Sequence, residues 1–398
     1  EMCIRDRGYI LENRVMQVLA KDTGSKSYKA HKYSLDHAER PYIDYSEDTI
    51  IWERTAETRI QNTYVPLERK SIDLAKRSDQ LLTYFLDGSR RVYKVDDHSY
   101  TMSVGRTVIY PIIAGQVGVG CCKRINKVVL PECFKREIVI SVPDIANADG
   151  KAGFFEAMLI KLNQIPILKQ MNTQIAKIIP YKTNTNASEK FEDRGTACIQ
   201  DRMIQCEKDM VAELVKKGML NQRNYLIKDG SLEYRPTKDI WNDERKSKIF
   251  KNNYNYVLGV SKNFNPEICK DINGKSNPGF IAELPLYHRT PVACYKNPKL
   301  FENIQFAVWY IRLRDKSHTR TAFDGIVKVE KMLVTQEECE YGIDSDLVDM
   351  LSALILNERN PVCYGSDLRW ANHLYPVYLT ETYVKSQYLS AESFLHLF

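Results

Sequence analysis

Apolar runs alternate with polar segments along the chain in a pattern that predicts strands interleaved with helices. β-Branched and aromatic runs bounded by turn residues predict strands, and apolar residues at helical spacing predict helices. Strands are predicted over residues 81–86, 91–95, 107–119, 137–142, 224–228, 256–260, 306–313 and 325–329. Helices are predicted over residues 152–164, 166–178, 193–217 and 345–356, and from about residue 379 onward.

The most regular of these segments is the helix over residues 193–217. Its apolar residues recur every three or four positions and form one stripe, and Gly218 provides a C-terminal stop. The stripe consists of Ile199, Met203, Cys206, Met210 and Leu214. We therefore expect this helix to pack against a sheet.

Strands interleaved with helices, together with adjacent strands joined by hairpins, predict an α/β fold with a mixed sheet flanked by helices. Residues 1–75 are charged and irregularly apolar, and we interpret them as a helical N-terminal extension. Residues 76–398 then form the main domain.

Composition adds limits to this picture. The chain has 398 residues, of which 43% are apolar and 27% charged, as expected for a folded protein and not for a disordered one. The net charge of +6 permits nucleic-acid binding without demonstrating it. No apolar run approaches the length of a membrane span, and the first residues lack the apolar core of a secretory signal. Scattered cysteines without metal-binding spacing predict reduced thiols and a cytoplasmic location.

Two predicted strands end in the same triplet, Asp87-Gly88-Ser89 and Asp229-Gly230-Ser231. An aspartate at a strand end can reach an ion while its backbone stays in the sheet, and the following glycine allows a sharp turn. Hard divalent cations prefer carboxylate oxygens, so the two aspartates are candidate ligands for Mg²⁺ or Mn²⁺. The alternative is that each triplet is an ordinary β-turn, since these are common turn residues.

A third carboxylate is available on the helix that precedes Asp229. Glu207 lies on the apolar stripe, where a buried charge needs a partner such as a metal ion, whereas Glu213 lies on the flank of the stripe. We therefore favour Glu207 over Glu213 as the third ligand. Lys262 follows the strand over residues 256–260 and could neutralise a scissile phosphate, although an ordinary surface lysine is the alternative.

The order of these motifs resembles the NurA nuclease family over roughly residues 80 to 390. A strand ends in Asp87-Gly88-Ser89-Arg90, a helix bears Glu207, and a second strand ends in Asp229-Gly230-Ser231-Leu232; Gly259-Val260-Ser261-Lys262, Gly325-Ile326-Val327-Lys328-Val329-Glu330 and Tyr375-Pro376-Val377-Tyr378-Leu379 follow. The resemblance implies an RNase H-like fold, a homodimer, and manganese-dependent cleavage of DNA. It also implies a HerA-type hexameric translocase as partner, in DNA end resection or antiviral defence.

Carried over by position, the resemblance makes Asp87, Glu207 and Asp229 the ligands of a pair of Mn²⁺ or Mg²⁺ ions. Lys262 and Tyr375 match catalytic positions of the family, and Arg90 and Lys262 are the predicted nucleic-acid contacts. The family's metal-site histidine falls on Tyr383, which is a poor neutral ligand. His373 or Glu381 could substitute for that histidine from nearby.

These observations predict a cytoplasmic, metal-dependent DNA nuclease that hydrolyses phosphodiester bonds with a HerA-type translocase. One alternative is a catalytically weakened, NurA-like adaptor or DNA clamp on a ring ATPase, which the tyrosine at position 383 favours. Another is an RNA-cleaving enzyme of the RNase H type, because no motif recognises a 2′-hydroxyl.

Overall fold

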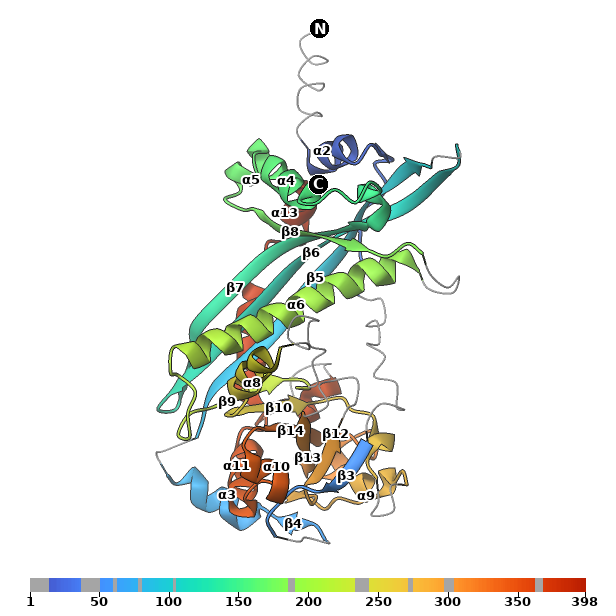
Figure 1. Cartoon of the computed structure of the whole chain (residues 1–398). Coiled ribbons are helices and arrows are strands. Elements are labelled where there is room, and N and C mark those ends of the chain that lie inside the picture. Colours follow the sequence, from blue (N-terminus) through green and yellow to red (C-terminus); the bar gives the residue numbers. More distant parts are fainter. Residues whose placement is uncertain are drawn as a thin grey trace.

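The structure is a computed structural model, and very long strands organise it. It describes residues 14–36, 51–59, 63–77, 81–102, 105–184, 190–232, 243–270, 275–296, 304–361 and 368–398. The described strands form one sheet of fourteen strands, whose main path is β3-β12-β13-β14-β10-β9-β5-β6-β7-β8. The pairs β5–β9, β9–β10 and β7–β8 are parallel, and the other pairs along this path are antiparallel. The predicted mixed sheet flanked by helices is therefore confirmed (Figure 1).

The strands are β1 (Lys26–Ser27), β2 (Tyr33–Ser34), β3 (Ile51–Thr55), β4 (Val65–Pro66), β5 (Leu82–Thr101), β6 (Thr107–Ile125), β7 (Val128–Pro143), β8 (Ile175–Tyr181), β9 (Tyr225–Asp229), β10 (Val257–Ser261), β11 (His288–Arg289), β12 (Ala293–Lys296), β13 (Gln305–Arg312) and β14 (Ile326–Leu333). The α-helices are α2 (Val15–Asp22), α3 (Glu68–Ala75), α4 (Phe154–Leu162), α5 (Pro166–Gln170), α6 (Phe191–Lys216), α8 (Glu244–Asn253), α9 (Pro278–Ala282), α10 (Gln336–Tyr341), α11 (Ser345–Asn357), α12 (Tyr375–Ser386) and α13 (Ala391–His396).

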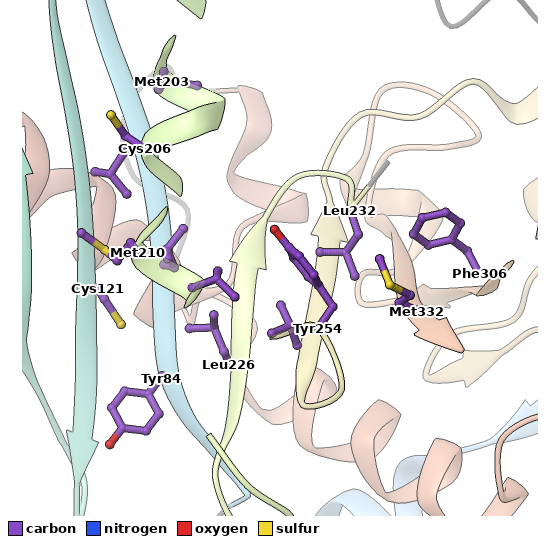
Figure 2. Close-up of a cluster of buried hydrophobic side chains, with 14 of the residues drawn as sticks. Tyr84, Cys121, Met203, Cys206, Met210, Leu226, Leu232, Tyr254, Phe306 and Met332 are labelled. Carbon is purple, nitrogen blue, oxygen red and sulfur yellow. The ribbon is translucent and has the colours of Figure 1, made fainter. Parts of the chain in front are cut away.

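The strands β5, β6 and β7 make a long antiparallel ribbon, and α6 runs across one of its faces (Figure 1). The predicted apolar stripe of α6 is buried against this face. Figure 2 shows Met203, Cys206 and Met210 of α6 in one apolar cluster with Tyr84, Cys121 and Leu226 of the sheet. Helix α12 packs against the opposite face of β5 and β6. These two surfaces are named the α6 face and the α12 face below.

Most predicted elements are present, but three predictions are wrong. The triplet Asp87-Gly88-Ser89 does not end a strand, because β5 continues through it and pairs with β6 on both sides. The second half of the helix predicted over residues 166–178 is instead β8, which pairs with β7. The last long helix, α12, begins at Tyr375 rather than near residue 379.

The N-terminal segment is mixed rather than purely helical. Its described residues contain α2 and α3, but also four short strands that join the sheet: β1 and β2 pair with β5, β3 pairs with β12, and β4 pairs with β11. A boundary near residue 75 and an RNase H-like topology stay predictions. Within the described part of the chain, no helix combines the length and apolar character needed to cross a bilayer.

Candidate active site

The two predicted aspartates lie side by side on neighbouring parallel strands. In the register of β5 and β9, Leu86 is the partner of Lys228, so Asp87 and Asp229 occupy the next position on each strand. Neighbouring strands are about 5 Å apart, and residues at one register position point to the same face. The cross-strand partner of Asp87 on β6, Gly120, faces Val384 of α12. Both aspartates therefore belong to the α12 face.

The strand β9 ends at Asp229, and the turn predicted there is confirmed. Gly230 has a φ of +86°, a conformation that glycine adopts readily and other residues rarely do. The turn is held from β14 by Glu330, which is fully buried. Its carboxylate accepts hydrogen bonds from Ser231 Oγ and from the Leu232 backbone N–H, each at 2.7 Å. Glu330 thus positions the turn that carries Asp229.

Lys262 and Glu381 complete this group on the α12 face. Lys262 Nζ lies 2.9 Å from Asp229 Oδ2 and 3.9 Å from a Glu381 carboxylate oxygen. Burial lowers the pKa of Lys262, but Asp229, Asp87 and Glu381 outweigh it and raise the pKa above its ordinary value. The backbone carbonyl of Lys262 accepts a hydrogen bond from Asn372, which also fixes the end of β10. Lys262 is therefore a largely covered part of the site, with its side chain 11% exposed, and not an ordinary surface lysine.

The surroundings of Asp87 strongly disfavour the ionised form of its carboxyl group. Burial raises the pKa of Asp87 well above its usual range, and the Asp229 carboxylate raises it further, while Lys262 opposes this effect. Glu381 and Glu207 add smaller contributions in the same direction as Asp229. The nearby positive charge of Lys262 therefore does not offset burial and the neighbouring carboxylates, and a bound cation would lower the pKa of Asp87.

Glu207 reaches the same cavity from the α6 face. Its side chain is almost fully buried and lies 3.2 Å from the ammonium group of Lys228. Lys228 also donates hydrogen bonds to the backbone carbonyls of Asp229 at 2.7 Å and Ser231 at 3.3 Å. Burial lowers the pKa of Lys228, but Glu207 and Asp229 outweigh it and keep the pKa above its ordinary value.

Gly88 makes room for Glu207. A Cβ atom built on Gly88 would lie 3.0 Å from Glu207 Cδ and 3.1 Å from Glu207 Cγ, and closer still to Oε1. The glycine of the first triplet therefore permits a close approach of α6 and not a turn, in contrast to the prediction from sequence.

Substitution of Gly88 by alanine is expected to destabilise the protein by about 1–3 kcal/mol, because the added methyl group overpacks the contact with Glu207. The measurement is denaturant unfolding of Gly88→Ala. The control is the same substitution in a Glu207→Ala background, where the methyl group has space and should cost little. Equal destabilisation in both backgrounds would contradict this explanation.

These residues line one cavity of about 360 Å³. Its described lining includes five acidic side chains (Asp36, Asp87, Glu207, Asp229 and Glu381) and four basic ones (Arg90, Lys228, Lys262 and Lys385). At its edge, Arg90 donates a 2.5 Å hydrogen bond to Gln200, and Lys385 forms a 2.6 Å ion pair with Glu381. Carboxylates and positively charged side chains thus line the same space, which could admit a phosphate group.

The donor chemistry of this cavity suits a hard divalent cation, since its carboxylate oxygens are the ligands that Mg²⁺ and Mn²⁺ prefer. The arrangement is not preformed, however. Among the residues that the structure describes, no three His, Cys, Asp or Glu side chains are gathered as a metal site. Lysines instead pair with Asp229 and Glu207.

Four other candidates lie outside the cavity lining. Glu213 is on the exposed side of α6 and pairs with Lys217 at 2.7 Å. Tyr383 packs edge-on against Phe134 at 5.7 Å. Tyr375 is 39% exposed at the start of α12, and the buried His373 packs against Tyr378. Of the two side chains predicted to take the place of the histidine that the resemblance implies, Glu381 is the one that lines the cavity.

Sequence analysis missed Lys228 and the positioning role of Glu330. A signal for Lys228 was present, because a lysine inside the apolar run of residues 225–227 must find a partner if the strand is buried. The partner could not be named, because Glu207 is distant in sequence and lies on a helix. Glu330 likewise contacts the Asp229 turn through the pairing of β10 with both β9 and β14.

No family profile and no curated protein sequence matches the chain. Among solved structures, the chain is similar to the NurA nuclease from Sulfolobus solfataricus, with a TM-score of 0.39 and 11% sequence identity. The match covers 99% of this chain and 92% of that chain. A similarity of this size carries no argument about function, which must come from the site.

Proposed function

We propose that this protein is a metal-dependent nuclease that hydrolyses phosphodiester bonds in DNA. The observation that carries this proposal is the juxtaposition of Asp87, Asp229 and Lys262 in one cavity. Two carboxylates on adjacent strands offer oxygen ligands to a divalent cation, and the lysine offers a positive charge to a phosphate. Phosphodiester hydrolysis needs both functions close together.

In this proposal Asp87, Asp229 and Glu381 hold Mn²⁺ or Mg²⁺ on the α12 face, and Glu207 contributes a further carboxylate from the α6 face. When bound, the cation would supply Lewis acidity for the attacking water and the leaving oxygen. Lys262 exchanges its contact with Asp229 for the negatively charged phosphate. Arg90, held in place by Gln200, contacts the DNA backbone at the edge of the cavity.

The wider assignment rests on the order of the sequence motifs. On that basis we propose a cytoplasmic homodimer that works with a HerA-type hexameric translocase in DNA end resection or defence. Tyr375 is not assigned a catalytic role, because it does not line the cavity.

A second function has its own support. Lysines already neutralise Asp229 and Glu207, and the tyrosine at the family's histidine position packs against Phe134. These features favour a catalytically weakened adaptor or DNA clamp on a ring ATPase. Such a protein would keep the charged cavity as a binding site for DNA.

The test is a cleavage assay on labelled DNA and RNA with Mn²⁺, with Mg²⁺ and with EDTA, in the presence and absence of a HerA-type translocase. We expect cleavage of DNA with Mn²⁺ and none with EDTA. Binding of DNA without cleavage under every condition would support the adaptor instead. Preferential cleavage of RNA would support the enzyme of the RNase H type.

A further inference from the structure

Two free cysteines face each other across the antiparallel strands β6 and β7. Cys121 of β6 is the direct cross-strand partner of Cys133 of β7. Directly opposed residues of an antiparallel pair have Cα atoms about 4.5 or 5.5 Å apart, and their side chains share one face of the sheet. A disulfide spans Cα separations of about 4.4–6.8 Å. The strand pairing therefore holds the two thiols at the spacing that a disulfide requires.

The backbone beside this pair is irregular. The register of β6 and β7 shifts between Cys121 and Cys122, because Cys122 is the partner of Pro131 and Glu132 is an extra residue in β7. A β-bulge of this kind interrupts the hydrogen-bond ladder locally. The backbone that leads into Cys133 is thus less constrained than a regular strand, and a small local movement can satisfy the angles of a disulfide.

The two thiols differ in their access to solvent. Cys121 is fully buried in the cluster under α6 that Figure 2 shows, whereas Cys133 is partly exposed at the edge of the same cluster. A reagent from solvent therefore meets Cys133 first, and Cys121 can react only with a group that is already attached to Cys133. This is the arrangement of an attacking thiol with a second thiol poised beside it.

The hydrogen bond between the two thiols supports the same assignment. The Cys121 thiol donates to the Cys133 sulfur, which lowers the pKa of Cys133 below its ordinary value. Burial and Glu213 oppose this lowering, and Lys217 supports it. The same hydrogen bond, together with burial, raises the pKa of Cys121. Because the thiolate is the nucleophilic form of cysteine, Cys133 is the more reactive of the two.

We propose that Cys121 and Cys133 are a peroxide-reactive dithiol, in which Cys133 attacks the oxidant and Cys121 then closes a reversible disulfide. The Cys133 thiolate attacks one peroxide oxygen, the O–O bond breaks, and hydroxide leaves with the proton that Cys133 released, as water. Cys121 then attacks the sulfur of the Cys133 sulfenic acid. The S–S bond forms, the S–O bond breaks, and the oxygen leaves with the Cys121 proton as a second water.

The disulfide would join β6 to β7 at the base of the hairpin formed by residues 122–132, so oxidation should hold this hairpin closed. In a compartment that keeps thiols reduced, the pair stays open until a peroxide appears. The two cysteines lie on the α6 face, whereas Asp87 and Asp229 belong to the α12 face. The inference therefore does not depend on the proposed nuclease function.

The test treats the reduced, purified protein with hydrogen peroxide and maps its cysteines by mass spectrometry. Trypsin can cleave between the two thiols at Lys123, Arg124 and Lys127, so a disulfide joins two separate peptides. We expect Cys121 and Cys133 to be lost together as free thiols and to appear in one cross-linked peptide pair. Dithiothreitol should restore both thiols.

Two variants separate the roles of the thiols. Cys133→Ser removes the attacking sulfur, so the disulfide should be lost and Cys121 should stay reduced. Cys121→Ala removes the second thiol, so Cys133 should remain a sulfenic acid that dimedone labels. If Cys121→Ala does not fold, the wild type and Cys133→Ser decide the test, because Cys133 is partly exposed and serine is similar in size.

The matched control is Cys339→Ser. Cys339 is also a partly exposed thiol, but its hydrogen bond is to the backbone carbonyl of Leu333, at 3.6 Å, and not to a second cysteine. The disulfide between Cys121 and Cys133 should form in Cys339→Ser as in the wild type. Oxidation of Cys339 in the wild type before any change at Cys133 would contradict the inference.

The remaining outcomes also decide the question. A disulfide of Cys133 with Cys122, a disulfide of Cys121 with Cys206, or a cross-link between two chains would each overturn the inference. Persistence of the Cys121 and Cys133 thiols in peroxide would do the same, as would a Cys133 sulfenic acid that accumulates in the wild type without closing the disulfide.

Discussion

Replacing Asp229 by asparagine is expected to reduce the rate of DNA cleavage roughly 10³-fold, the order of loss seen when one essential electrostatic group is removed from an active site. The amide keeps the shape of the side chain but loses the charge that binds a cation and contacts Lys262. Asp229 is backbone-paired with Val260 of β10, so the variant should fold. The measurement is the initial rate with Mn²⁺, together with circular dichroism and DNA-binding affinity.

Asp209→Asn is the matched control for this experiment. Asp209 is an exposed aspartate on the same helix as Glu207, and it accepts a hydrogen bond from Gln205 away from the cavity. Its substitution removes one negative charge and should leave cleavage unchanged. Cleavage by Asp229→Asn at the wild-type rate would show that the reaction does not pass through this cavity.

Secondary structure could be predicted best from the sequence where it depends on residues close together in the chain. The apolar stripe of α6 repeats at helical spacing, so the helix and its buried side could be predicted, including the burial of Glu207 and the exposure of Glu213. The preference for Glu207 as a metal ligand stays a prediction. The turn after Asp229 was predictable for the same reason, since Gly230 supplies a local conformation that few other residues adopt.

The prediction failed for a glycine whose role depends on tertiary packing. Gly88 was interpreted as part of a turn, whereas in the structure it allows Glu207 of α6 to pack closely. Gly115 and Gly118 allow close packing in the same way, Gly115 against Ile199 and Gly118 against helix α12 and Tyr388. A single sequence does not distinguish a glycine that bends the backbone from one that admits a helix.

The composition of the site was predictable only in part, because it is assembled from elements far apart in the chain. Asp87 and Asp229 become neighbours through the parallel pairing of β5 with β9, which no local pattern specifies. Glu381 enters because α12 covers the face opposite α6. Lys228 finds Glu207 because strand alternation turns it to the α6 face. Each contact depends on which face of the sheet a residue occupies.

Asp87→Asn is expected to change how the stability of the metal-free protein depends on pH. Burial, followed by the Asp229 carboxylate, raises the pKa of Asp87 well above its ordinary value in the folded state. In the unfolded chain the same group titrates near its usual value of about 3.9. Between these two pKa values the folded state binds more protons, so the free energy of unfolding falls as pH rises.

The stabilising contribution of protonated Asp87 is complete below the unfolded pKa and is lost as pH rises through the folded pKa. Asparagine does not titrate, so Asp87→Asn should lack this loss and should exceed the wild type in stability at high pH. The measurement is urea unfolding of both proteins in EDTA from about pH 4 to about pH 9. If the free energies of unfolding of wild type and Asp87→Asn changed in parallel with pH, the folded state would not disfavour the ionised form of Asp87. Asp209→Asn is the control, and its free energy of unfolding should change with pH in parallel with the wild type.

Addition of Mn²⁺ should reverse the order of the two proteins. A divalent cation binds the ionised carboxylate, so it stabilises the folded wild type by mass action, and more strongly as pH rises. Asp87→Asn has lost this ligand and should gain less from the same concentration of Mn²⁺. The ionised Asp87 carboxylate is thus expected to lower the free energy of unfolding without metal and to raise it when Mn²⁺ is bound, as expected for a metal ligand. A Mn²⁺-induced rise in Tm of equal size in both proteins would place the ion elsewhere.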